Sequence, residues 1–287
     1  MPQIVRSSKW IPVAVLLSLS ACAAEEREFS TPCKALICDD FESSEVGAAP
    51  AGRWRVGTSD DGMGNMTGAV AVDSTRAFSG NRSVKISTVE NDNWKSAQLI
   101  FADTSALPTK DNVVFGRAMV WVESVPDKNL TWGLITGKGM VPGETHEAYY
   151  RYGGSEPVPG PDGSVGSKLA AFYDTPGSYD VPPSAPETNC WNHATSDIMP
   201  VGRWACVEWK FDGGNDEMQL WLDGFGIPGL NLKGTGQGCT GGQSADFVWK
   251  APTFTEILVG WETGDPDVAR TIWVDDVVIG AEKVGCP

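Results

Sequence analysis

The sequence is built from short apolar or alternating runs that are separated by Gly, Pro, Asn and Asp, and no segment sustains a period of 3.6 residues. Runs of this kind are typical of strands, and turn sequences such as Asp223-Gly224 close several of them. Many strands without helices in one domain predict an all-β fold, a two-sheet antiparallel β-sandwich of the jelly-roll type. The expected strands are Ala35–Phe41, Ser83–Val89, Ala97–Ala102, Val113–Val122, Trp132–Thr136, Ala148–Tyr152, Lys168–Asp174, Trp204–Phe211, Glu217–Asp223, Glu256–Glu262 and Thr271–Ile279.

Alternation within the expected strand Val113–Val122 separates two kinds of side chain. Its even-numbered residues from Gly116 onward are small and aliphatic, so this face fits the space between the sheets. We expect the other face to be the open side of a curved sheet, where a ligand would lie. That face carries Phe115, Arg117, Met119 and Trp121.

The first 22 residues carry the features of a bacterial lipoprotein signal. Arg6 and Lys9 form a basic region, and the apolar run from residue 11 to 19 is too short to span a bilayer. Leu19-Ser20-Ala21-Cys22 matches a lipobox, in which the cysteine thiol accepts the lipid. We expect a signal peptide over residues 1–21, a lipidated tether over 22–32 and one β-jelly-roll domain over 33–287. A simple signal peptide with a chance cysteine is the alternative.

Composition narrows the location and the partners. Ala23 and Ala24, rather than Asp, follow the cysteine, which favours the outer membrane over the inner membrane. No later run is long and apolar enough to cross a bilayer, so the lipid is the only expected membrane contact. The net charge of −15 and the pI near 4.5 argue against nucleic acid as a partner. We expect a monomer in the bacterial cell envelope, as an outer-membrane lipoprotein or a secreted protein.

Six cysteines remain besides Cys22, and an even number in an exported chain predicts three disulfides. Their spacing does not fit a zinc site, because no C-x-x-C pair occurs. Two lie near the start of the domain and one at its end, so we expect at least one bridge to join the termini. The sequence leaves the pairing open among Cys33, Cys38, Cys190, Cys206, Cys239 and Cys286.

All five tyrosines fall between residues 149 and 179, and both histidines, His146 and His193, flank this stretch. Tyrosine and histidine combine an apolar ring with a polar tip, which suits the wall of a ligand site. Segments rich in Gly, Pro and Ser, residues 153–166 and 175–187, interrupt it, and we expect them to be rim loops. A Tyr-rich strand pair packed as ordinary core is the alternative.

Several motifs, in order along the chain, resemble a known family. They include Tyr150-Arg151-Tyr152-Gly153-Gly154, Trp204-Ala205-Cys206-Val207-Glu208-Trp209, Trp221-Leu222-Asp223-Gly224 and Trp273-Val274-Asp275-Asp276-Val277. Together they resemble the bacterial exported lipoproteins related to the fungal cellulose-induced secreted protein, within the concanavalin-A-like lectin/glucanase superfamily. Jelly-roll polysaccharide lyases belong to the same structural neighbourhood. The resemblance covers nearly all of residues 33–287 and implies a jelly roll, whereas the fold does not fix the activity.

The resemblance implies a surface lipoprotein that binds a polysaccharide in a cleft and cleaves it by β-elimination. That reaction needs a group that neutralises a uronate carboxylate, a base and an acid. Arg117 and Arg151 are the candidate neutralisers, and His146 with Tyr150 or Tyr152 would supply the base and the acid. The candidate substrate-binding residues are Trp121, Trp132 and Tyr173.

One departure from the lyases keeps other functions open. The Gln-x-His pattern of such lyases is absent from the nearest strand, Asn129-Leu130-Thr131-Trp132. A non-catalytic carbohydrate-binding protein, or an envelope interaction protein with a vestigial cleft, is therefore the alternative. Glycoside hydrolysis is less well supported, because Glu144 and Glu147 do not form a strand signature of jelly-roll glucanases.

A structural calcium site is a further expectation from the resemblance. In jelly rolls of this kind the first and last strands pair, which brings an early acid beside a late one. Hard oxygen ligands at such a junction suit Ca²⁺. The candidate ligands are Glu42 and Asp275, with Ser79 and Asn81 from an intervening turn.

Overall fold

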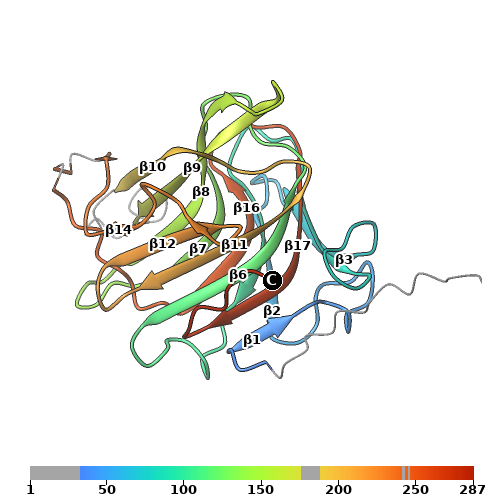
Figure 1. Ribbon diagram of the computed structural model, residues 1–287, viewed down its shortest axis with the longest axis horizontal. Coiled ribbons are helices and arrows are strands. Elements are labelled where there is room, and N and C mark those ends of the chain that lie inside the picture. Colours follow the sequence, from blue (N-terminus) through green and yellow to red (C-terminus); the bar gives the residue numbers. More distant parts are fainter. Residues whose placement is uncertain (1–32, 176–187, 241–242, 245) are drawn as a thin grey trace, which may run out of the picture.

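The computed structural model describes residues 33–175, 188–240, 243–244 and 246–287, and the expected signal peptide, Cys22 and the tether lie outside them. The described chain forms two antiparallel sheets packed face to face, which confirms the predicted jelly-roll β-sandwich (Figure 1). Sheet A runs β13 (Phe225–Gly226), β12 (Glu217–Leu222), β11 (Trp204–Asp212), β6 (Val113–Val122), β17 (Arg270–Gly280), β4 (Ser83–Thr88) and β3 (Gly68–Asp73), with β1 (Ile37–Asp39) on β17 and β14 (Leu232–Lys233) on β12.

Sheet B forms the other layer. It runs β15 (Gly238–Cys239), β10 (Asn189–Ile198), β9 (Val165–Asp174), β8 (Glu147–Pro159), β7 (Trp132–Met140), β16 (Glu256–Thr263), β5 (Lys95–Phe101) and β2 (Trp54–Thr58). The described residues contain no helix, and therefore none that is long and apolar enough to cross a membrane.

The core lies between the sheets and follows from the alternation of the strands. On β6, Ala118, Val120 and Val122 are fully buried in it, as their spacing predicts. Gly116 shares this face, and a Cβ there would lie only 2.0 Å from the Trp209 ring. The absence of a side chain at Gly116 therefore leaves the space that the Trp209 ring of β11 occupies beside β6.

The segment 153–166 is not the rim loop that its composition predicts. It belongs to the β8–β9 hairpin, and only the turn near Gly160 and Ser164 departs from the two strands. Pro157 is tolerated in this hairpin because the pairing register shifts between Ser155 and Pro157, where a missing N–H disturbs the ladder least. The other expected loop, residues 175–187, lies outside the described residues after Thr175.

Three disulfides form, as the even cysteine count predicts, and they pair Cys33 with Cys38, Cys190 with Cys239, and Cys206 with Cys286. The expectation of a bridge between the termini is wrong. The first bridge is local, and the last one fixes the C-terminal segment to β11 in the middle of sheet A. Backbone pairing of β1 with β17, rather than a disulfide, joins the two ends of the domain.

Candidate functional site

Alternation along β8 sorts the tyrosine cluster into two faces. Tyr150 and Tyr152 point between the sheets and are 0% and 1% exposed. Their hydroxyls donate to the carbonyl oxygens of Trp249 and Leu230 at 2.6 and 3.0 Å. Burial raises the pKa of both phenols far above the ordinary value. The expectation that they act as acid and base is therefore corrected: they are hydrogen-bonded core residues that a polysaccharide does not reach.

Two of the expected substrate-binding rings lie in the same core. Trp132 stacks on Trp261 with ring centroids 4.6 Å apart, and its Nε1 donates to Ser167 Oγ. Tyr173 stacks on Trp249 and is 2% exposed. Both are corrections of the sequence-based assignment, because rings that fill the space between two sheets cannot also form a platform for a sugar.

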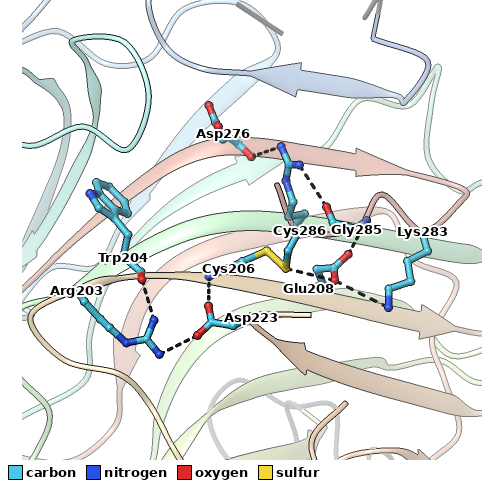
Figure 2. The surroundings of a disulfide bond; sticks show 10 residues. Arg203, Trp204, Cys206, Glu208, Asp223, Asp276, Lys283, Gly285 and Cys286 are labelled. Atoms are coloured by element: carbon cyan, nitrogen blue, oxygen red, sulfur yellow. Dashed lines mark hydrogen bonds and ion pairs between the residues drawn. A yellow bond between two sulfur atoms is a disulfide. The ribbon is translucent and has the colours of Figure 1, made fainter. Parts of the chain in front are cut away.

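Arg117 and Trp121 face outward from sheet A, the sheet opposite β8. Arg117 lies beneath the C-terminal segment, where its guanidinium donates to the carbonyl oxygens of Gly285 and Asp276 at 3.3 Å. The Cys206–Cys286 bridge and Glu208 hold that segment in place, since Gly285 N donates to Glu208 Oε1 (Figure 2). Arg117 is 7% exposed, so the C-terminal segment shields the expected uronate-neutralising arginine from a substrate.

Trp121 belongs to an aromatic row on the outer face of sheet A rather than to a site shared with the tyrosines. Its cross-strand partners in register are Trp204 and Trp273. Arg76 stacks on its ring, with Cζ 3.8 Å from the ring centroid. The structure thus separates Trp121 from Arg151 by the full thickness of the sandwich.

On the outer face of sheet B, one expected catalytic residue, Arg151, lies among other charged side chains. Arg151 projects from β8 away from the core, and its Nη1 lies 2.6 Å from Asp174 Oδ2 of β9. Its Nε lies 2.8 Å from Glu262 Oε1 of β16. We call these three residues the Arg151 cluster. Asp174 comes from the neighbouring strand β9 and Glu262 from β16, on the far side of β7, so the pairing of four strands of one sheet fixes the three positions.

The charges of the cluster are largely withdrawn from solvent. The side chains of Arg151, Asp174 and Glu262 are 19%, 16% and 7% exposed. Burial raises the pKa of Asp174 to about 6, against the opposing pull of Arg151. Burial also pulls the pKa of Arg151 down, but Glu262 and Asp174 more than offset this and raise it. The cluster therefore carries two acids for one cation, and one acid changes its charge near neutral pH.

Polar and aromatic residues surround the cluster. Gln98 Nε2 donates to Glu262 Oε2 at 3.0 Å, which fixes the second oxygen of that carboxylate. Two rings flank the guanidinium, with Arg151 Cζ 5.0 Å from the Tyr149 ring centroid and 5.9 Å from that of Trp94. Trp94 is 38% exposed. The face thus offers an accessible aromatic ring beside fixed hydrogen-bonding groups, a combination that suits a hydroxyl-rich ligand.

The sequence-based reasoning found Arg151 but missed Asp174 and Glu262. Each is the last residue of an expected strand. An acid on the outward face of a strand whose other face is apolar was the sequence feature that could have indicated them. His146 does not join them. It precedes β8 by one residue and is five residues before Arg151, roughly 16 Å along an extended chain. The candidate base is thus placed too far away for the same sugar ring.

Glu42, three residues after β1, and Asp275, on β17, both accept hydrogen bonds from the turn that contains the other two expected calcium ligands, Ser79 and Asn81. Asp275 Oδ2 accepts hydrogen bonds from Phe78 N and Ser79 N, and its Oδ1 accepts one from Asp276 N. Glu42 Oε1 accepts from Asn81 N and Arg82 N. Burial and the neighbouring Asp276 raise the pKa of Asp275 to about 7. Both carboxylates therefore hold the turn between Phe78 and Arg82 through its N–H groups, and a cation at this junction stays a prediction.

Comparisons with known proteins agree with this architecture. Residues 178–282 match the family model described as "Polysacc_lyase-like: Cip1-like, core domain". The solved structure of the cellulose induced protein Cip1 aligns over 88% of this chain and 100% of its own, with 20% identity and a TM-score of 0.52. The chain is a Cip1-like β-sandwich.

Other solved structures align less closely with this Cip1-like fold. The alginate lyase AlyC3 aligns over 69% of this chain and 74% of its own, with 7% identity and a TM-score of 0.38. The CBM22-1 xylan-binding domain of Paenibacillus barcinonensis Xyn10C aligns over 88% and 97%, with 11% identity and a TM-score of 0.38. No curated protein sequence matches the chain.

Proposed function

We propose that this protein is a lipid-anchored surface protein of the bacterial envelope that binds a polysaccharide across the outer face of sheet B. The observation that carries the proposal is the Arg151 cluster, in which three strands fix one cation and two carboxylates beside the exposed ring of Trp94. Fixed charged groups of this kind donate to and accept from sugar hydroxyls, while an indole face packs on the C–H face of a pyranose ring. The Cip1-like fold also supports a polysaccharide as the ligand.

Binding, rather than cleavage, fits the electrostatics of the cluster best. Both carboxylates already engage Arg151, so its charge is neutralised before any ligand arrives. The chain as a whole carries a net charge of −15, which opposes the approach of a uronate polymer. A neutral glycan meets neither obstacle, and it can hydrogen-bond to Arg151, Asp174 and Gln98 without displacing a counter-charge.

Affinity electrophoresis of the purified protein in gels that contain xylan, mixed-linkage glucan, pectin or alginate tests this proposal. We expect retardation by a neutral polysaccharide, and we expect Trp94→Ala to abolish it, because this half-exposed ring can be removed without opening the core. Trp204→Ala on sheet A is the matched control and should leave the retardation intact. Equal mobility in all gels, or an unchanged response of Trp94→Ala, would contradict the proposal.

β-Elimination is the second candidate function, and the pKa of Asp174, raised to about 6 by burial, is the observation that favours it. A carboxyl group with such a pKa can accept a proton from a sugar ring near neutral pH. Arg151 would face the uronate carboxylate, and Tyr149, which lies beside it, would give its phenolic proton to the leaving oxygen as the C4–O bond breaks. Ultraviolet absorbance of the unsaturated product on pectin or alginate tests this step, and Asp174→Asn should abolish it. A flat trace with retained binding would leave recognition as the function.

A further inference from the structure

A hollow lies at the far edge of sheet A, away from the Arg151 cluster. The short strands β13 and β14 both pair with β12, but they do so only at its two ends. Residues 227–231 connect β13 to β14. The hollow has a volume of about 270 Å³. It is lined by Gln219, Leu220, Trp221, Gly226, Ile227, Pro228 and Asn231.

The lining combines an apolar floor with uncharged polar groups. Leu220 and Ile227 are 4% exposed and close the hollow from below. A Cβ on Gly226 would lie 3.6 Å from Trp221 Nε1, so the missing side chain leaves the N–H edge of the indole open. Gln219 donates its amide N–H to Glu217 Oε1, which holds the amide oxygen in a fixed orientation. None of the seven lining residues is charged.

The wall of the hollow is held in place from both sheets. Ile227 N donates to Leu220 O at 3.0 Å, and Thr195 N of β10 donates to Pro228 O at 3.2 Å. The hydroxyl of Tyr152, on β8, donates to Leu230 O at 3.0 Å. A loop that is tied to three strands of two sheets loses little conformational entropy when a ligand binds, which favours affinity.

We propose that this hollow binds one uncharged sugar residue, as a site separate from the Arg151 cluster. The indole N–H, the Gln219 oxygen and the Asn231 amide match the mixed donor and acceptor pattern of sugar hydroxyls, and the Leu220–Ile227 floor matches an apolar C–H face. The volume lies just below the usual range for drug-sized ligands, so it suits a single ring or a chain end. Lys283 Nζ lies 4.0 Å from the Trp221 ring centroid, so that ring face is occupied and the sugar approaches the N–H edge.

Nuclear magnetic resonance of the ¹⁵N-labelled full chain carrying Cys22→Ser tests this site directly. The probes are D-glucose, D-galactose, D-xylose and, as the charged comparison, D-glucuronate. The Trp221 indole resonance is assigned by its loss in Trp221→Phe, and the Asn231 side-chain resonances by their loss in Asn231→Asp. We expect at least one neutral sugar to shift both, with saturation at a Kd of about a millimolar, as few atoms make contact. Gly226→Val fills the hollow on a strand position that accepts a β-branched residue, and it should abolish the shifts.

The controls separate this site from the Arg151 cluster. Trp94→Ala should leave the Trp221 and Asn231 shifts unchanged, whatever it does to polysaccharide binding on sheet B. Asn231→Ala is an exposed substitution outside any strand, so it covers the case in which Gly226→Val fails to fold. It should raise the Kd measured from the Trp221 shift at least fivefold. If none of the three neutral sugars shifts the Trp221 and Asn231 resonances, the proposal is overturned. Shifts that persist in Gly226→Val, or an equal response to D-glucuronate, would overturn it as well.

Discussion

The guanidinium of Arg151 lies 2.6 Å from the carboxylate of Asp174 on the outer face of sheet B, directly behind the buried tyrosines of the same strands. A charged pair that is held by adjacent strands responds to substitution both in stability and in recognition. The two responses can be measured separately, because unfolding reports the first and glycan binding reports the second.

Removing Arg151 should destabilise the protein strongly. Arg151→Met leaves two carboxylates with little exposure and no cation between them, and we expect a loss of about 3–5 kcal/mol in the free energy of unfolding. Urea unfolding monitored by fluorescence measures it. Arg203→Met is the control, because its pair with Asp223 is exposed and should contribute less than about 1 kcal/mol. Equal losses in the two variants would show that the Arg151 cluster is not a buried ion-pair network.

Asp174 should give the stability a defined dependence on pH. Its pKa in the folded state, about 6, exceeds the usual 3.8, so its contribution is most favourable below pH 4 and is lost as the pH rises through 6. The difference amounts to about 3 kcal/mol. We expect the free energy of unfolding of the wild type, relative to Asp174→Asn, to fall between pH 4 and pH 6. A pH-independent difference between the two proteins would contradict the raised pKa.

The Cys206–Cys286 bridge should contribute more to stability than the Cys33–Cys38 bridge at the start of the domain. The Cys206–Cys286 bridge closes 80 residues and the Cys33–Cys38 bridge closes only 5. Because a longer loop loses more entropy on closure, Cys286→Ser should cost about 4 kcal/mol and Cys38→Ser clearly less. Thermal unfolding under non-reducing conditions compares them. A larger loss in Cys38→Ser would mean that the local bridge, and not the C-terminal one, limits stability.

Calcium should raise the Tm if Glu42 and Asp275 share a cation. A ligand that binds only the folded state at one hundred times its Kd contributes about 2.7 kcal/mol, which corresponds to a rise of several degrees. We expect this rise on adding Ca²⁺ after chelation, and we expect Glu42→Gln to remove it. Asp61→Asn is the control, because Asp61 lies in a separate exposed turn. A Tm that is the same with chelator and with Ca²⁺ would exclude a structural calcium site.

Cys22 should carry the lipid. Expression in a bacterial host with labelled palmitate is expected to label the wild type and to leave Cys22→Ser unlabelled. Ser20→Thr retains the cysteine and a small hydroxyl side chain in the lipobox, so it should keep the label. Labelling of Cys22→Ser would assign the modification to another residue.

The sequence predicts the sandwich better than the site. Regular alternation in Val113–Val122 was enough to place its inner face correctly, because one apolar set was clearly distinct from the other. In β8 both sets contain a tyrosine, and side-chain type alone cannot tell which pair is buried. The hydrogen bonds from Tyr150 and Tyr152 to Trp249 and Leu230 decide it, and those partners lie 99 and 78 residues away.

The remaining errors have the same origin in long-range contacts. Arg117 lies on the predicted outward face, but the segment around Gly285 covers it, and only the pairing of Cys206 with Cys286 brings that segment there. The strand β10 was not expected at all, because its sequence is polar and it becomes a strand only by pairing with β9. Asp174 and Glu262 were visible as residues but not as neighbours, since strand order in a sheet does not follow from local sequence.

The alternation of β8 has a consequence for genetics. Residues 149 and 151 reach the outer face of sheet B, whereas residues 150 and 152 are enclosed in the core. A saturation library over this stretch can be sorted once for surface display and once for glycan capture. Codons 150 and 152 should govern only how much protein reaches the cell surface, codon 149 should govern mainly what the displayed protein binds, and codon 151 should affect both.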